Sequence, residues 1–216
     1  MNLIEYFRSF IKKEDQAPAA MKYLIIGLGN MGNEYDHTRH NVGFDAIDAL
    51  ASEAKVRFKN EQLGDLAEYK YKGRQIYLLK PSTFMNLSGK SVRYWVQKLK
   101  IQNDHWLIIV DELQFNIGDF KLQKKGSSGG HNGLKSVQDL MQTSNYARIR
   151  IGIGNDFHRG QQVDYVLGKW KEDEWTLVSK TLPEICKTVH SFVTIGVDRA
   201  MSQHNKRSSK TSAKEP

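Results

Sequence analysis

Short apolar runs alternate with segments of helical hydrophobic spacing, and this alternation constrains the fold of the chain more than any other feature. Residues 22–28 and 106–110 are apolar runs of strand length, and the first of them contains its glycine near the end. Apolar residues recur at helical spacing within 44–54 and 92–99. Strands separated by helices pair in parallel and need cover on both faces. We therefore expect an α/β fold: a single domain with a mixed, largely parallel twisted sheet covered by helices on both faces.

The remaining elements fit the same architecture. Residues 68–80 resemble a hairpin that turns at Lys72-Gly73-Arg74, which makes the sheet mixed. Ser88 is a candidate cap for the second helix. A long helical pattern over 171–203 contains Pro183, which should break or kink it, since proline lacks an amide hydrogen. Two further strands are expected at 118–123 and 147–153, with a helix at 134–141.

Length and composition indicate one ordinary globular domain with short extensions. The chain has 216 residues, of which 39% are hydrophobic and 26% charged. We expect a core domain at 21–205, an N-terminal extension at 1–20 that is helical or disordered, and a basic disordered tail at 206–216. No apolar run is long enough to cross a bilayer, and the acids in the extension argue against a targeting peptide. The single cysteine, Cys186, cannot form an internal disulfide. These features predict a cytoplasmic protein that does not bind membranes.

The net charge of +8 gives a first indication of a partner. A basic domain followed by a basic tail is typical of a protein that binds a polyanion such as RNA. Charge alone leaves a second interpretation open, in which the protein is basic only for solubility.

Polar residues follow several predicted strands at the point where each strand ends. Ligands of open α/β sheets bind beyond the carboxyl ends of the strands, so these residues are candidates for a site. If the strands are neighbours, three asparagines, two histidines and an aspartate gather at one rim. The six residues are Asn30, His40, Asn86, Asp111, His131 and Asn132.

Two glycine motifs suggest other functions but fit them poorly. Gly27-x-Gly29-x-x-Gly32 matches a dinucleotide-binding fingerprint, which requires a helix to begin within the glycines. Here polar residues 33–40 intervene before any helical pattern. Gly126-Ser127-Ser128-Gly129-Gly130 has the spacing of a serine-hydrolase elbow, but it follows a charged segment instead of a buried strand. A loop that gives backbone amides to an anion explains these residues better.

Five motifs, in order along the chain, resemble those of the bacterial-type peptidyl-tRNA hydrolase family. Each motif alone is a weak signal, but five in order with the family's approximate spacing are specific. The resemblance covers about Met21 to Asn205. The motifs are Gly-Leu-Gly-Asn-x-Gly-x-x-Tyr-x-x-Thr-Arg-His-Asn-x-Gly at 27–43, Phe-Met-Asn-Leu-Ser-Gly at 84–89, Asp-Glu-Leu at 111–113, Gly-Gly-His-Asn-Gly-Leu-Lys-Ser at 129–136 and Arg-Ile-Arg-Ile-Gly-Ile-Gly at 148–154.

The resemblance implies a monomeric enzyme without metal or cofactor, which hydrolyses the ester between a peptide and the 3′ end of tRNA and so recycles tRNA. Carried over by position, His40 is the proton acceptor and Asp111 the acid that stabilises its working form. Asn30 distinguishes blocked from free amino groups. The other matched positions are Tyr35, Phe84, Asn86 and Asn132 as substrate contacts, Met85 and His131 as active-site wall, and Lys121 and Arg150 as tRNA phosphate contacts.

The chain departs from the family pattern at three places. Met31 replaces a usual proline, which removes a fixed φ angle beside Asn30. Gln114-Phe115-Asn116 replaces an acid and prolines. Gln123 stands at a usually basic position, where Lys124 or Lys125 could supply the missing charge to a phosphate.

The residue types also suit this chemistry independently. A neutral imidazole can take a proton from water that attacks an ester, and a carboxylate can fix its tautomer. Asparagine amides can donate to an oxyanion without adding charge. Two alternatives remain open at this point: an RNA-binding module without catalysis, and a serine hydrolase that uses Ser128. DNA is not an expected partner. For His131, a catalytic and a structural role are both open.

Overall fold

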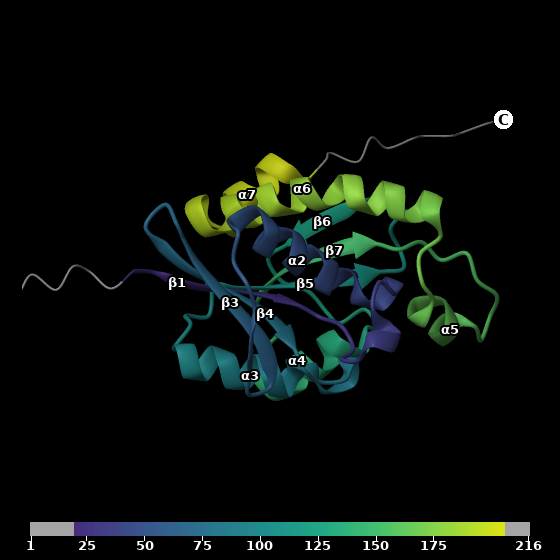
Figure 1. Ribbon diagram of the computed structural model, residues 1–216, viewed down its shortest axis with the longest axis horizontal. Coiled ribbons are helices and arrows are strands. Elements are labelled where there is room, and N and C mark those ends of the chain that lie inside the picture. Colours follow the sequence, from purple (N-terminus) through teal and green to yellow (C-terminus); the bar gives the residue numbers. More distant parts are fainter. Residues whose placement is uncertain (1–19, 206–216) are drawn as a thin grey trace, which may run out of the picture.

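The computed structural model describes residues 20–205, so the predicted character of the N-terminal extension and of the tail 206–216 lies outside it. Its strands form one mixed sheet in the order β2-β3-β4-β1-β5-β7-β6, with the four central strands β4, β1, β5 and β7 in parallel (Figure 1). Antiparallel strands β3 and β2 extend one edge and β6 the other. This arrangement confirms the predicted α/β class. The strands are β1 (Lys22–Gly27), β2 (Lys59–Glu61), β3 (Gly64–Tyr71), β4 (Arg74–Pro81), β5 (Trp106–Glu112), β6 (Phe120–Gln123) and β7 (Ala147–Gly152).

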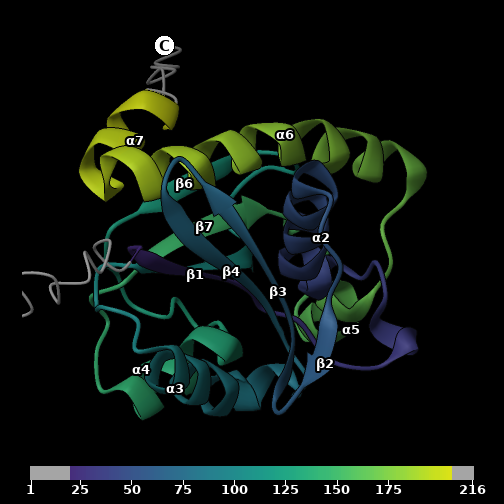
Figure 2. The same ribbon diagram turned by 60° about the vertical axis from the view of Figure 1, so that its left-hand side comes forward.

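Helices cover both faces of the sheet, because the central strands are apolar on both sides. In β1, Ile25 packs with α2 and α6, whereas Leu24 and Ile26 pack with α3 and α4. Figures 1 and 2 show α2, α6 and α7 on one side and α3 and α4 on the other. None of the described helices is long and apolar enough to span a membrane. The helices are α2 (Val42–Ala54), α3 (Ser88–Leu99), α4 (Asn132–Met141), α5 (Gln162–Leu167), α6 (Glu172–Ile195) and α7 (Val197–His204), with 3₁₀ turns η1 (Asn33–Tyr35), η2 (Arg39–Asn41) and η3 (Met85–Leu87).

The glycines that resembled a dinucleotide motif serve close packing instead. A Cβ on Gly27 would lie 2.1 Å from the carbonyl oxygen of Gly43, so glycine lets the end of β1 touch the first turn of α2. No helix begins within the motif, because η1 and η2 precede α2 as the sequence predicted. The segment that contains η1 and η2 places His40 at the carboxyl edge of the sheet.

The cap predicted at Ser88 was wrong, and of the break or kink predicted at Pro183, the break does not occur. Ser88 is the first residue of α3 and not its cap, which is Leu87. Because η3 leads directly into α3, the Ser88 hydroxyl points back and donates to the carbonyl of Met85 at 2.8 Å. Helix α6 does not end at Pro183 but continues to Ile195. Pro183 is exposed, so water can reach the carbonyl that lacks an amide partner, while the opposite face of α6 stays packed on the sheet.

Candidate active site

A pocket of about 570 Å³ opens at the carboxyl ends of the parallel strands. Its polar lining comes from the segments after β1 and β4, from the end of β5, from Arg150 of β7 and from the start of α4. Ten of the twelve predicted site residues line it, and Lys121 and Lys124 do not. The ten are Asn30, Tyr35, His40, Phe84, Met85, Asn86, Asp111, His131, Asn132 and Arg150.

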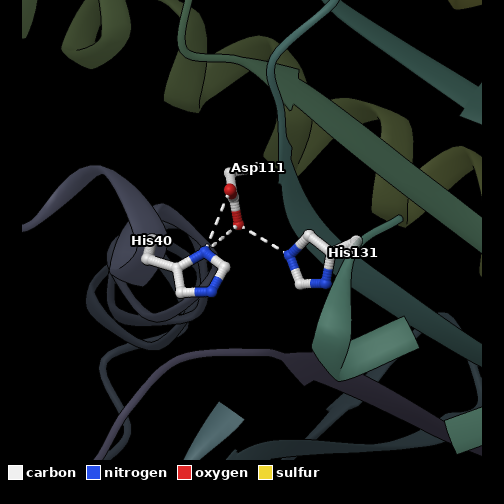
Figure 3. Close-up of side chains that lie close together, drawn as sticks. All are labelled: His40, Asp111 and His131. Atoms are coloured by element: carbon white, nitrogen blue, oxygen red, sulfur yellow. Dashed lines mark hydrogen bonds and ion pairs between the residues drawn. The ribbon is translucent and has the colours of Figure 1, made fainter. Parts of the chain in front are cut away.

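Asp111 is the centre of the polar side of this pocket. It lies near the end of β5, and its side chain is 3% exposed. Nδ1 of His40 lies 3.0 Å from both carboxylate oxygens, and Nε2 of His131 lies 2.8 Å from Oδ1 (Figure 3). Although burial opposes ionisation, the two imidazoles outweigh it and hold the pKa of Asp111 well below its usual range. Asp111 is therefore a carboxylate that accepts hydrogen bonds from both sides.

The two histidines differ in the hydrogen bonding of the ring nitrogen that does not contact Asp111. Nδ1 of His131 accepts backbone N–H groups of Gly133 at 3.1 Å and Leu134 at 3.3 Å, as the cap of α4. Since Nδ1 is an acceptor, the ring proton sits on Nε2 and is donated to Asp111. His40 instead donates from Nδ1, which leaves its Nε2 as the nitrogen with a lone pair for a ligand. Both ring nitrogens of His131 are thus engaged in hydrogen bonds, whereas Nε2 of His40 has no hydrogen-bond partner among the described residues.

The environment of His40 adjusts its proton affinity. Burial by itself would lower the pKa of His40, but the charge of Asp111 and the hydrogen bond to it outweigh burial, so the pKa is raised above its usual value. His40 is therefore a stronger base than an isolated imidazole.

The same three side chains could also be considered as metal ligands. Their ligand atoms all lie within 4.8 Å of one another. A metal would need the lone pair of His131 Nε2, and the displaced proton would then have to move to Nδ1. That atom already faces the amides of Gly133 and Leu134. The hydrogen-bond pattern therefore fits a proton-sharing cluster better than a metal site.

Asn30 is held so that its amide donor remains available. Its Oδ1 accepts the backbone N–H of Met85 at 2.8 Å, which commits the oxygen and leaves the Nδ2 group for a ligand. Its backbone is held by the side chain of Asn41, which accepts from the Asn30 N–H at 2.8 Å and donates to the Asn30 carbonyl at 3.0 Å. Asn86 and Asn132 are exposed at the rim. Asn41 was quoted in the first motif, but its supporting role was not predicted.

Aromatic and apolar side chains form the remainder of the pocket. Tyr35 and Phe84 meet edge to face with ring centroids 6.4 Å apart, and Phe84 is 44% exposed. Helix α5 contributes a wall that the sequence did not reveal, because six residues are too few to show a helical period. The wall residues are Gln162, Val163, Val166 and Leu167.

The predicted phosphate contacts are in different environments. Lys121 is exposed on the edge strand β6, with Arg150 as its cross-strand partner. Arg150 is buried: it forms an ion pair with Glu112 and donates to the carbonyl of Ser127 at 2.8 Å. Lys124 makes an exposed ion pair with Asp198 at 2.7 Å. Of these three cations, Lys121 is the one that is exposed and has no ion pair among the described residues.

Ser128 has none of the surroundings of a nucleophile. It does not line the pocket, and its carbonyl accepts a 3.4 Å hydrogen bond from Arg150. The serine-hydrolase alternative therefore has no geometric support among the described residues.

Comparison with known proteins identifies the family. A sequence model described as peptidyl-tRNA hydrolase matches residues 24–213. The chain is 50% identical over 187 residues to peptidyl-tRNA hydrolase of Bacteroides fragilis, a match that covers 87% of this chain and 100% of that protein. It is 49% identical over 189 residues to the enzyme of Cytophaga hutchinsonii, covering 86% and 98%. The crystal structure of peptidyl-tRNA hydrolase from Acinetobacter baumannii superposes with a TM-score of 0.80 at 36% identity, over 85% of this chain and 94% of that one. The chain therefore belongs to the peptidyl-tRNA hydrolase family, a family of hydrolases.

Proposed function

We propose that this protein hydrolyses the ester that joins a peptide to the 3′ end of tRNA, with His40 as the general base that activates water. The observation that carries this mechanism is the cluster at Asp111: the carboxylate fixes the Nδ1 proton of His40 and leaves Nε2 as a proton acceptor in a substrate-sized pocket. His131 completes the cluster from the other side, and we assign it a positioning role.

The reaction needs one water and no covalent intermediate. Nε2 of His40 takes a proton from water as the water oxygen attacks the ester carbonyl carbon. Asp111 stabilises the imidazolium that forms. An asparagine amide in the pocket donates to the oxyanion. The carbon–oxygen bond to the ribose then breaks, the leaving oxygen takes the proton back from His40, and peptide and tRNA are released.

Recognition of the blocked amino group is assigned to Asn30, with Asn86 and Asn132 as further contacts. The uncharged amide N–H of asparagine can donate a hydrogen bond to a peptide carbonyl, whereas a free ammonium group has no lone pair to accept one. Tyr35 and Phe84 offer ring surface to the terminal nucleotide or the peptide, with Met85 as wall.

The test of this specificity is to measure release from N-acetyl-aminoacyl-tRNA and from aminoacyl-tRNA. Fast cleavage of the acetylated substrate alone is expected. Equal rates would contradict the specificity, and no cleavage of either would contradict the function and favour a binding module.

Contact with tRNA phosphates is assigned to Lys121, to Arg150 from within the pocket, and to Lys124 or Lys125 in place of Gln123. Each phosphate contact contributes about 0.7 to 0.9 to the slope of log affinity against log salt. Lys121→Ala should therefore raise KM and flatten that slope by about this amount. Lys70→Ala is the matched control, because Lys70 is an exposed strand lysine near the opposite edge of the sheet. Equal slopes for the two variants would remove Lys121 from the interface.

We further infer that the protein acts as a monomer, without metal or cofactor, in the cytoplasm where peptidyl-tRNA arises, and that it does not use DNA or a membrane. The proton arrangement at His131 supports the metal-free mechanism. Full activity after dialysis against a chelator, from a species of monomer mass in light scattering, is expected. Activity that is lost to the chelator and restored by a divalent cation would contradict it.

A further inference from the structure

Arg39, the residue directly before His40, is buried although it carries a charge. It is 6% exposed, and it lies in the same 3₁₀ turn, η2, as His40. Buried arginines are held by several hydrogen bonds, because an unpaired charge in the interior is costly. Its partners therefore show what this turn is attached to.

The partners of Arg39 lie at the end of α5, in the segment that follows it and in the first turn of α6. Nη1 donates to the carbonyls of Lys169 at 3.0 Å and Tyr165 at 3.4 Å. Nη2 forms an ion pair with Glu174 at 2.6 Å. The backbone N–H of Arg39 donates to the carbonyl of Gly168 at 3.0 Å. One residue thus joins the turn of His40 to a segment about 130 positions later.

Ring contacts and close packing complete the attachment. The guanidinium carbon lies 4.4 Å from the ring centroid of Tyr165 and 5.4 Å from that of Trp170. A Cβ on Gly168 would lie 3.0 Å from Nη1, so glycine provides the space that the guanidinium occupies. A lysine has neither the fork nor the flat face that these contacts use.

Helix α5 depends on attachments of this kind. Six residues are too few for a helix that is stable alone, and its last turn is closed only by the C-cap, where the Gly168 N–H donates to the Tyr165 carbonyl at 3.2 Å. Arg39 supplies a cation and two donors at that end. At its other side, the Tyr165 hydroxyl donates to the carbonyl of Ile153 at 2.6 Å. The same helix presents Val163 and Val166 to the pocket.

We propose that Arg39 is a positioning residue that fixes the α5 wall of the substrate pocket relative to the turn carrying His40. The wall and the general base then keep one mutual placement, so a substrate seated on α5 presents its ester to Nε2. This inference rests on the proposed role of His40.

The test combines hydrogen exchange with steady-state kinetics on the full chain. In Arg39→Met, amide exchange at residues 163–168 should rise by about tenfold or more, as expected for loss of local anchoring. The ratio kcat/KM should fall by about ten- to a hundredfold, since a displacement of about 1 Å at a reacting group has this effect. Arg39→Lys should recover little of either. If Arg39→Met does not fold, Glu174→Gln replaces it and should change both quantities in the same direction by less.

Arg74→Met is the matched control. Arg74 also donates to two backbone carbonyls, those of Lys72 at 2.7 Å and Thr194 at 3.1 Å, but at the other end of the sheet. Its kcat/KM should stay within about twofold of the native value.

Unchanged exchange at 163–168 in Arg39→Met would overturn the proposal, and so would an unchanged kcat/KM of that variant. Full activity in His40→Ala would instead contradict the proposed function, and the exchange experiment would still report on Arg39.

Discussion

The two walls of the pocket are built in opposite ways. The polar wall consists of His40 from η2, Asp111 from the central strand β5 and His131 from the cap of α4, and these three side chains are nearly buried. The apolar wall is the short helix α5, whose Val163 is 64% exposed and which is attached through Arg39 and Tyr165. Groups that move protons need fixed mutual distances, whereas single side chains of a peptide-binding surface contribute contact area, as long as the surface itself is held in place. Removing a side chain of the polar wall should therefore change mainly kcat, and changing an exposed side chain of the apolar wall should change mainly KM.

The largest expected effect comes from removing the base in the polar wall. His40→Ala should lower kcat by about 10² to 10⁴-fold, the usual contribution of a positioned general base. KM should change little, because the imidazole acts mainly in the transition state. Single-turnover kinetics on N-acetyl-aminoacyl-tRNA would measure both. His158→Ala is the control, an exposed histidine outside the pocket; a normal kcat in His40→Ala would contradict the mechanism.

The next effect concerns the carboxylate that both histidines share. Asp111→Asn should lower kcat by as much as His40→Ala or by less, since the base remains but loses its fixed tautomer. In the native enzyme, the rate should rise with pH through the raised pKa of His40, because only the neutral ring is a base. Without the carboxylate, burial remains and lowers that pKa, so the acid limb should move to lower pH. An unmoved limb of kcat/KM against pH would show that Asp111 does not control His40.

A smaller and different effect is expected from the apolar wall. Val163→Thr replaces a methyl group by a hydroxyl on a side chain that a bound substrate would cover. KM should rise by about two- to tenfold, because the free energy gained by covering part of an aliphatic side chain is lost, while kcat stays near the native value. Ile195→Thr, exposed at the end of α6, is the control. A fall in kcat with constant KM would mean that α5 belongs functionally to the polar wall.

The smallest effect is expected at Ser128, which belongs to neither wall. Ser128→Ala should keep kcat and KM within about twofold of native. Mass spectrometry of the enzyme quenched during turnover should find no acyl adduct. An acyl group on Ser128 would replace the water mechanism by covalent catalysis.

The predicted element order agrees with the structure where hydrophobic spacing was long enough to be distinctive. Strands β1 and β5 and helices α2 and α4 lie where apolar spacing placed them. Packing outweighed a local rule at two places. Burial of one face lets α6 continue without the break that was one of the two outcomes predicted at Pro183, and η3 makes Ser88 a helical residue instead of the predicted cap. Helix α5 was not predicted at all.

The sequence alone was enough to predict that the asparagines, histidines and aspartate of the strand ends gather at one pocket, because residues at the ends of parallel strands meet at one edge of the sheet. It could not determine what each group does there. The hydrogen bonds that separate His40 from His131 join Asp111 to residues 71 and 20 positions away, and those of Arg39 cross about 130 positions. Tertiary packing determines these partners, because the residue pattern of one segment does not specify which atoms of a distant segment its side chains will contact. Only the folded arrangement therefore shows that His131 uses both ring nitrogens in hydrogen bonds, that Nε2 of His40 has no such partner among the described residues, and that Arg150 is engaged by Glu112 and Ser127 inside the protein.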